Sequence, residues 1–265
     1  MKPIIVANWK CNPATIREAK FIFNSVKREL ISFQRGTKDI KNVEVVFCPP
    51  FVFFSLKFNS GAGVRNKSSI FKLGAQNSFW EEGGAFTGEI SPLMLKDWGC
   101  QYVILGHSER RGILGETDEV INKKIKTVLK VKLRPIFCIG EASEERKEGG
   151  ALVRLKSQIE KGLQGIPQKE IPNIILAYEP IWAIGTGNAC SPEEAQNVKL
   201  FLERILIQKF SSSVVKSMRM LYGGSVNAEN GKDFIEKAGF NGLLIGGASL
   251  KPKELANIIK DIAGH

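Results

Sequence analysis

Residues 174–187 read IILAYEPIWAIGTG, an apolar run that ends in one carboxylate and continues into a loop of proline, tryptophan, glycine and alkyl side chains. A short apolar run bounded by turn-forming residues is typical of a strand buried on both faces. Glu179 stands where this predicted strand ends. The stretch therefore predicts a parallel sheet with a polar group at the end of a strand.

Seven further apolar runs of the same kind recur along the chain. They are Pro3–Trp9, Val43–Cys48, Phe71–Gln76, Tyr102–Gly106, Pro135–Ile139, Met218–Gly223 and Gly242–Gly246, and the run quoted above makes the eighth, Ile174–Glu179. Amphipathic stretches with helical spacing, such as 16–30 and 120–129, lie between them. Eight alternating units in 265 residues predict a closed (β/α)8 TIM barrel.

An open, doubly wound sheet is the structural alternative, but it normally begins with a glycine-rich nucleotide loop, which the sequence WKCN at 9–12 does not resemble. Ser191 followed by proline and two glutamates predicts a capped helix start, and Ser143 followed by two glutamates predicts another. No linker or change in composition divides the chain. We therefore predict one TIM-barrel domain over 1–265.

The chain carries 38 Lys and Arg against 27 Asp and Glu, a net charge of +11. Such a charge suits nucleic acid, an anionic surface or a phosphorylated substrate. The basic residues are scattered along helical segments without long basic runs or interleaved aromatics, so we interpret them as solvated helix faces and expect no nucleic-acid partner.

The five cysteines are widely spaced and form no C-x-x-C or His-rich metal pattern. We interpret them as reduced thiols of a cytoplasmic protein and predict no metal. No signal peptide is readable before the first predicted strand, and no apolar run reaches the length of a membrane span, so no membrane association is expected.

Polar residues collect at the predicted carboxyl ends of the strands, where barrels carry their chemistry. They are Asn8, Lys10, Gln76, Asn77, His107, Glu109, Glu179, Ser225, Gly246 and Gly247. Singly, each has a structural interpretation: an exposed lysine, a hydrogen-bonded histidine, a capping glutamate, turn glycines. Together they place an acid, an imidazole and an ammonium group at one mouth.

The glycine-rich ends around Ser225 and Gly246 follow the seventh and eighth strands, where barrels often bind phosphate through backbone N–H groups. Glycines without Cβ atoms let phosphate oxygens approach the backbone. We therefore expect a phosphorylated substrate. No redox-cofactor motif is evident, so no cofactor is predicted and the protein's own groups must do the chemistry.

Several long motifs in order resemble the triosephosphate isomerase family, nearly from end to end. They are NWK at 8–10, GAFTGE at 84–89, GHSERR at 106–111, AYEPIWAIGTG at 177–187, YGGSV at 222–226 and GGASL at 246–250. The resemblance implies an isomerase of glycolysis and gluconeogenesis that interconverts dihydroxyacetone phosphate and D-glyceraldehyde 3-phosphate through an enediolate.

The resemblance also implies a role for each matching residue. Glu179 would be the base, and His107 would be a neutral imidazole that donates to the substrate oxygens. Lys10 would supply a fixed positive charge, and Asn8 would orient the site. The pairing of a glutamate with a neutral histidine follows from the family and not from the residues alone. Supporting positions would be Glu109 and Tyr222, and the ligands of substrate and its phosphate would be Asn8, Lys10, Gly185, Ser225, Gly246 and Gly247.

The segment after the base resembles the family's lid, here Pro180, Trp182, Ile184, Gly185 and Thr186, which would exclude water when closed. The loop Glu82–Glu89 resembles an interface loop whose threonine, Thr87, would insert beside Asn8 and Lys10 of a second copy. Cys11 would lie near that interface. The implied assembly is a homodimer.

Some positions depart from the family pattern. Asn188-Ala189-Cys190 replace a Lys-Thr-Ala-like hinge, and Ala62–Ser69 resembles a surface insertion. Counting from Glu179, Glu203 and Asn241 stand where the family usually has an arginine and its aspartate partner. Either the Asn241 amide donates a hydrogen bond to the Glu203 carboxylate, or both side chains are solvated and unlinked.

Two other functions are compatible with parts of the sequence. Another phosphate-binding barrel, acting on indole or ribulose phosphates, would explain the glycines but not the set of Lys10, His107 and Glu179. A surface-adhesion or nucleic-acid role would use the charge of +11 and would show salt-sensitive binding.

Overall fold

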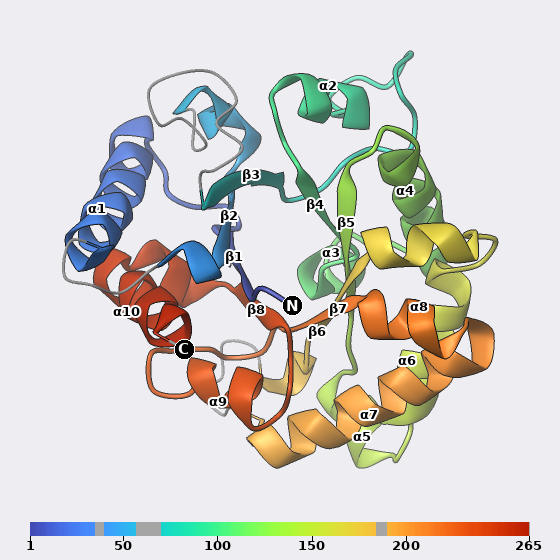
Figure 1. Ribbon diagram of the computed structural model, residues 1–265. Helices are drawn as coiled ribbons and strands as arrows, with labels where there is room; N and C mark the ends of the chain where they lie inside the picture. Colours follow the sequence, from blue (N-terminus) through green and yellow to red (C-terminus); the bar gives the residue numbers. More distant parts are fainter. Residues whose placement is uncertain (35–39, 57–69, 184–189, 265) are drawn as a thin grey trace.

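The protein forms a closed barrel of eight parallel strands, each paired with the next and the eighth paired with the first (Figure 1). The structure, a computed structural model, describes residues 1–34, 40–56, 70–183 and 190–264. The strands are β1 Ile4–Asn8, β2 Glu44–Cys48, β3 Phe71–Ala75, β4 Tyr102–Leu105, β5 Arg134–Ile139, β6 Ile175–Tyr178, β7 Arg219–Tyr222 and β8 Gly242–Ile245. The predicted barrel is confirmed, and pairing of Ile4 with Gly242 excludes the open sheet.

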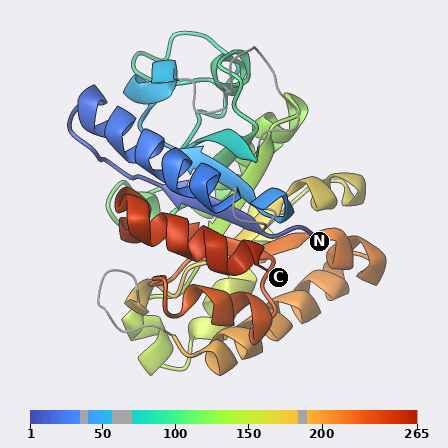
Figure 2. The same ribbon diagram turned by 60° about the vertical axis from the view of Figure 1, so that its left-hand side comes forward.

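Helices surround the barrel on its outer side (Figure 1). They are α1 Ile16–Gln34, α2 Pro92–Asp97, α3 Ser108–Gly112, α4 Asp118–Lys130, α5 Ser143–Lys147, α6 Ala151–Gly162, α7 Pro192–Lys209, α8 Ser212–Ser217, α9 Gly231–Glu236 and α10 Pro252–Ala263. The first and last long helices, α1 and α10, lie side by side, as Figure 2 shows, and Lys260 of α10 pairs with Glu29 of α1 at 3.0 Å. This contact joins the two ends of the chain.

The two predicted helix starts differ in their capping residue. Ser191 caps α7 as expected: its hydroxyl accepts from the amide of Glu194, and the Glu194 carboxylate accepts from the amide of Ser191. At α5 the cap is Ala142, and Ser143 is already the first helical residue, so this part of the prediction is wrong. The carboxylate of Glu145 accepts the Ala142 amide at 2.8 Å and satisfies this end without a serine.

Side chains along each strand alternate between the barrel interior and the surrounding helices. On β6, Ile175 and Ala177 belong to the apolar cluster inside the barrel, whereas Leu176 and Tyr178 pack in the larger cluster between barrel and helices. Glu179 stands two residues after Ala177, so it is the next residue on the face that points into the barrel. The alternation therefore turns the carboxylate into the mouth of the barrel.

Of the two alternatives for Glu203 and Asn241, the structure has the one without a hydrogen bond between them. The Glu203 carboxylate accepts from Lys199 at 2.6 Å within α7, and no hydrogen bond joins Glu203 to Asn241, both of which are described. The backbone N–H of Asn241 donates to Met220 O at 2.8 Å, and its side-chain oxygen accepts from Met220 N at 2.9 Å. Asn241 thus extends the short pairing of β7 with β8, and the two residues are unlinked.

The last residue of α6, Gly162, packs against the barrel so closely that a Cβ atom there would lie 2.3 Å from Cζ of Phe137. At Gly112, the last residue of α3, a Cβ atom would meet no other part of the described chain within 4 Å. The two positions are therefore a matched pair of helical glycines, one confined and one free.

We predict that Gly162→Ala lowers the free energy of unfolding by about 1–3 kcal/mol, because the added methyl group overpacks the Phe137 contact. Gly112→Ala should raise it by up to about 1 kcal/mol, because alanine favours the helix and meets no obstacle. Denaturant melts of the two variants measure both values. Equal effects of the same sign would contradict the packing described here.

Candidate active site

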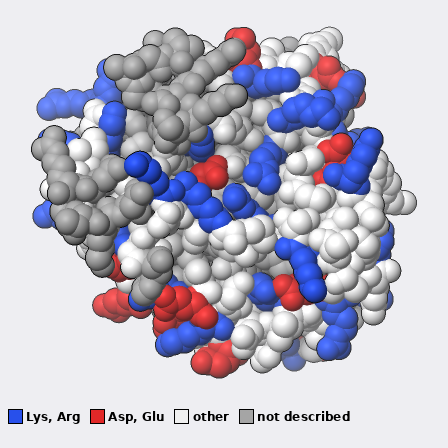
Figure 3. All heavy atoms as spheres, viewed as in Figure 1, with Lys and Arg blue, Asp and Glu red and all other residues white. Residues whose placement is uncertain are grey.

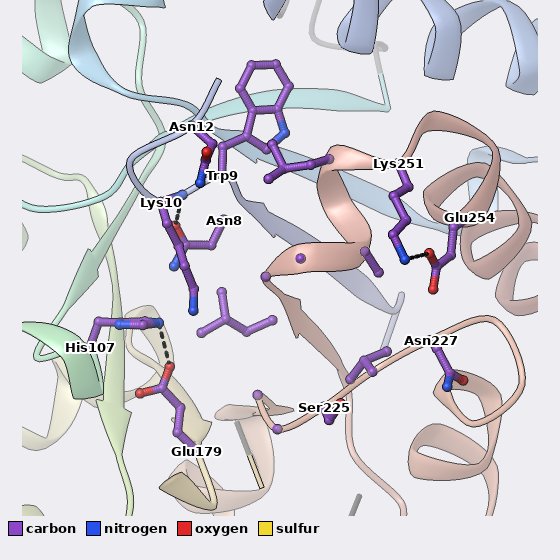
Figure 4. Close-up of a pocket in the computed structure, with 18 residues that line it drawn as sticks. Asn8, Trp9, Lys10, Asn12, His107, Glu179, Ser225, Asn227, Lys251 and Glu254 are labelled. Atoms are coloured by element: carbon purple, nitrogen blue, oxygen red, sulfur yellow. Dashed lines mark hydrogen bonds and ion pairs between the residues drawn. The ribbon is translucent and has the colours of Figure 1, made fainter. Parts of the chain in front are cut away.

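A pocket of about 530 Å³ opens at the carboxyl ends of the strands (Figure 4). Its walls come from residues that follow β1, β4, β6, β7 and β8. Among the lining residues are Asn8, Lys10, His107, Glu179, Ser225, Gly246 and Gly247, all predicted from the sequence. The structure therefore brings together polar groups separated by more than two hundred residues.

Glu179 and His107 face each other in this pocket (Figure 4). The Glu179 carboxylate is only 1% exposed; its Oε1 atom lies 3.2 Å from Nε2 of His107, and its Oε2 accepts a hydrogen bond from the Ser108 amide at 3.0 Å. A buried carboxylate with one oxygen held by a backbone N–H and the other directed at an imidazole is suited to proton transfer.

The orientation of the His107 ring decides which nitrogen carries the proton in the neutral form. The backbone N–H of Glu109 donates to Nδ1 at 3.3 Å, so Nδ1 acts as an acceptor. A neutral imidazole then keeps its proton on Nε2, the atom that faces Glu179. The ring can thus donate a hydrogen bond to a ligand in the pocket.

Lys10 is held both at its side chain and at its backbone. Its ammonium group pairs with Glu109 Oε1 at 2.6 Å, which places Glu109 in the predicted supporting position. The backbone of Lys10 is left-handed, with φ of 54°, a conformation that costs a non-glycine residue about 1–3 kcal/mol. Asn8 Oδ1 accepts the Lys10 amide at 3.1 Å, and Gln76 donates to the Lys10 carbonyl at 2.8 Å, so the strained conformation is fixed from both sides.

Glycines keep the pocket open next to these groups. A Cβ atom on Gly223 would lie 3.0 Å from Cγ of Glu179, and one on Gly246 would lie 3.2 Å from Cε of Lys10. Beyond its chain neighbours, no atom of the described residues lies within 4 Å of a Cβ built on Gly247. The backbone near Gly246 and Gly247 is therefore accessible to a ligand that needs close approach.

Glu141, which was not predicted from the sequence, follows Gly140 just past β5 and is 1% exposed. Its Oε1 atom accepts from the Tyr178 hydroxyl at 3.0 Å and from the indole N–H of Trp182 at 2.9 Å. The guanidinium of Arg146 lies 4.4 Å from the Trp182 ring centroid. The signal was a polar residue just past the fifth strand, the same position that the other site residues occupy.

The sequence of the whole chain matches the model of one protein family, described as triosephosphate isomerase, over residues 3–262. The chain belongs to the triosephosphate isomerase family. It is 43% identical to the triosephosphate isomerase of Dictyoglomus thermophilum over 98% of this chain and 99% of that protein. The identity is 45% to that of Alkaliphilus oremlandii, over 97% and 98%, and 43% to that of Aquifex aeolicus, over 98% and 99%.

The structure describes only part of the predicted lid. Trp182 lies in η4, Ile181–Ala183, and Pro180 packs beside Gly224, where a Cβ atom would be 2.9 Å from Cγ of the proline. Ile184, Gly185 and Thr186, the hinge residues 188–189 and the predicted insertion 62–69 lie outside the described residues. Cys190 is described and is 1% exposed, and burial raises the pKa of its thiol to about 12.

Tyr222, Cys11 and Thr87 were also predicted from the sequence. Tyr222 is fully buried, with its ring stacked on Phe234 at 3.6 Å between centroids, and burial raises the pKa of its hydroxyl. Cys11 and Thr87 are exposed in the single chain. Within the described ranges, no helix is long and apolar enough to cross a membrane.

We predict that Glu141 makes stability depend on pH. Burial raises the pKa of this carboxyl above its usual 4.5, so the folded protein holds the proton more tightly than the unfolded chain does. The resulting stabilisation is present below pH 4.5 and is lost as the pH rises through the raised pKa. Glu141→Gln should therefore gain stability relative to the wild type as the pH rises above 4.5.

Denaturant melts across this pH range provide the measurement. Glu160→Gln is the matched control, because Glu160 is an exposed carboxylate on α6 and its substitution should show no such trend. A stability difference for Glu141→Gln that stays constant with pH would contradict the assignment.

Proposed function

We propose that this chain interconverts dihydroxyacetone phosphate and D-glyceraldehyde 3-phosphate, with Glu179 as the base that moves the proton. Membership of the family and the names of the relatives support the reaction. The observation that supports the assignment of the base is the buried Glu179 carboxylate, 3.2 Å from His107 Nε2 at the mouth of the barrel. The reaction is a step of glycolysis and gluconeogenesis, and we place it in the cytoplasm, in accord with five free cysteines.

In this mechanism Glu179 removes a proton from the carbon next to the substrate carbonyl, and the electrons of that C–H bond form the enediolate. The proton of the substrate hydroxyl passes to the former carbonyl oxygen, and the same carboxyl group returns the carbon-bound proton to the adjacent carbon, so acid and base are one residue. The His107 Nε2–H donates to the substrate oxygens, on which negative charge develops. The ammonium of Lys10, fixed by Glu109 at 2.6 Å, stabilises that charge, and Asn8 orients Lys10 through its backbone amide.

The phosphate group would bind at Ser225, Gly246 and Gly247, and the absence of Cβ atoms at the two glycines lets its oxygens reach backbone N–H groups. Gly185, outside the described residues, completes the proposed set. In Figure 4 Ser225 lies apart from Glu179 and His107, so a phosphate bound there would leave these two side chains free for the chemistry. The reactive carbons of a three-carbon ester would then lie between the two ends.

The segment Pro180 to Gly187 would close over the bound substrate as a lid. An enediolate exposed to water can expel its phosphate group, and an apolar cover that excludes water suppresses this elimination. Trp182 supplies part of the cover, and its hydrogen bond to Glu141 at 2.9 Å fixes one end of the segment. The lid thus connects β6 to the chemistry that Glu179 performs.

A coupled assay of triose phosphate interconversion tests the reaction, and Glu179→Asp tests the base. We predict a loss of turnover of about 100-fold with a modest change in KM, because removing one methylene withdraws the carboxylate from the substrate carbon. Glu160→Asp on the exposed face of α6 serves as control and should keep full activity. Near-wild-type turnover of Glu179→Asp would remove Glu179 from this role.

We also propose that the chain is a homodimer. The loop Glu82–Glu89 is exposed along almost its whole length, and large apolar side chains of this loop, of residues 51–56 and at α2 are also exposed in the single chain. They include Val52 (76%), Phe86 (42%), Met94 (53%) and Trp98 (54%). Phe54 of η2, Phe51–Leu56, contacts Trp98 at 6.5 Å between ring centroids, which joins the η2 and α2 parts of this surface. Apolar groups gathered on one surface are typical of an interface.

Thr87→Arg should shift the protein towards monomer and lower its activity, because Thr87 is proposed to contact the partner's copy of the Lys10 region. Sedimentation and activity on dilution measure both effects. Ser212→Arg, which adds the same charge at an exposed position on α8, should leave dimer and activity unchanged. A fully active wild-type monomer would rule out the proposed dependence on the dimer.

A further inference from the structure

Helices α1 and α10 lie side by side on the outside of the barrel, as Figure 2 shows, and a groove opens between α1 and residues 250–253, at the start of α10. The volume of this α1–α10 groove, about 630 Å³, is within the range of pockets that bind small molecules. Its lining residues are Phe21, Ser25, Arg28, Glu29, Leu250, Lys251, Pro252 and Lys253. Of these, Leu250 and Lys251 also line the candidate active site, and the other six do not.

The apolar part of the α1–α10 groove consists of one aromatic ring and two aliphatic groups. Phe21 keeps 63% of its surface exposed, and Leu250 and Pro252 line the groove with it. Removing apolar surface from water is favourable, so an exposed ring in a hollow offers contact area to a ligand. The flat face of a second ring is well suited to stack on it.

The polar residues of α1 share a face with this ring. Residues 21, 25 and 28 follow the spacing of one helix face, so Phe21, Ser25 and Arg28 all line the groove. Seven residues rise about 10.5 Å along an α-helix, which separates Arg28 from Phe21 by two turns. Arg28 donates to the Ser25 hydroxyl at 3.1 Å, and this bond holds the guanidinium on the same face.

Both carboxylates at the α1–α10 groove already have a lysine partner. Glu29 pairs with Lys260 at 3.0 Å, and Glu254 pairs with Lys251 at 3.1 Å. Neither carboxylate is therefore an unpaired negative charge that would repel an anion.

Two cations of the groove remain after these pairs are counted. Within the described ranges, neither Arg28 nor Lys253 forms an ion pair, and both side chains are exposed. The pKa of Glu29 is lowered, first by its hydrogen bond with Lys260 and further by the charges of Lys253 and Arg28, so both cations lie near this one carboxylate. The groove thus carries an excess of two positive charges at the Arg28 end.

Positive charge by itself selects no site on this protein. On the face drawn in Figure 3, Lys and Arg atoms are scattered over many places, and several of them lie beside Asp and Glu atoms. The α1–α10 groove differs because a hollow, an exposed ring and two cations without ion pairs occur together there. This combination suits a ligand that has a flat apolar part and an anionic part.

We propose that the α1–α10 groove binds a nucleoside diphosphate, with its base stacked on Phe21 and its phosphate groups at Arg28 and Lys253. Every base has a flat face that stacks on an aromatic ring, and guanidinium and ammonium groups are common partners of phosphate. The ribose and diphosphate reach from the ring to the cations, and the diphosphate offsets their two charges. One ring with two small aliphatic groups suits a base better than a long alkyl chain. The site is independent of the proposed function, whose substrate binds at the mouth of the barrel.

Equilibrium dialysis of the full-length protein with radiolabelled ADP, at constant ionic strength, tests the proposal. We expect one class of sites to weaken by about tenfold in Phe21→Ala, which removes the stacking surface, and in Arg28→Gln and Lys253→Met, which each remove a cation. None of the three residues lines the candidate active site. The matched controls are Ile207→Ala and Lys209→Met, which remove an exposed apolar group and an exposed cation from α7 and should bind like the wild type.

Unlabelled competitors separate the two parts of the ligand. Pyrophosphate should displace ADP less well than unlabelled ADP does, and its affinity should fall in Arg28→Gln but not in Phe21→Ala. Excess dihydroxyacetone phosphate should leave ADP bound. ADP isotherms of Phe21→Ala and Arg28→Gln that match the two α7 controls, or displacement of ADP by dihydroxyacetone phosphate, would overturn the proposal. These measurements involve no turnover, so a failed isomerisation assay would count against the proposed function alone.

Discussion

Side chains alternate between the inside and the outside of the barrel along each of its parallel strands. This alternation in a closed barrel is the constraint on which the rest of this structure depends. Because β1 pairs with β8, the barrel is closed and all strands run in the same direction. The side chains that point inward along each strand therefore begin at one mouth of the barrel and end at the other. The series Ile175, Ala177, Glu179 ends in the catalytic candidate, and the series that begins at Arg219 ends at Gly223, which leaves room for that carboxylate. One geometric rule therefore sets both the reactive group and the space around it.

Around this frame, short hydrogen bonds fix the side chains whose positions matter. The Ser108 amide holds one oxygen of Glu179, the Glu109 amide sets the tautomer of His107, and Asn8 with Gln76 holds the strained backbone of Lys10. Such preorganisation places donors where charge develops, so little reorganisation is needed during the reaction. The left-handed Lys10 shows that the fold accepts a local cost to keep the ammonium in the pocket.

The sequence allowed the barrel and most of the candidate site to be predicted, because both follow from local patterns. Apolar runs located all eight strands, and the polar residue after each run indicated Asn8, His107 and Glu179. Glu141 was missed although it follows the fifth strand as the other site residues follow theirs, and its contacts with Tyr178 and Trp182 show what it holds in place. The sequence left open whether Glu203 and Asn241 are linked, because residue counting gives no side-chain direction; the structure leaves them unlinked, and the backbone amide of Met220 donates to the asparagine oxygen.

The central claim is that one carboxyl group, Glu179, carries the proton between two substrate carbons. Proton NMR of dihydroxyacetone phosphate in heavy water, with wild type and Glu179→Gln, measures it most directly. The account predicts that the wild type incorporates deuterium at the reacting carbon and isomerises the substrate, and that Glu179→Gln loses both activities together. Continued deuterium incorporation by Glu179→Gln at the wild-type rate would show that another group removes the proton and would contradict the account.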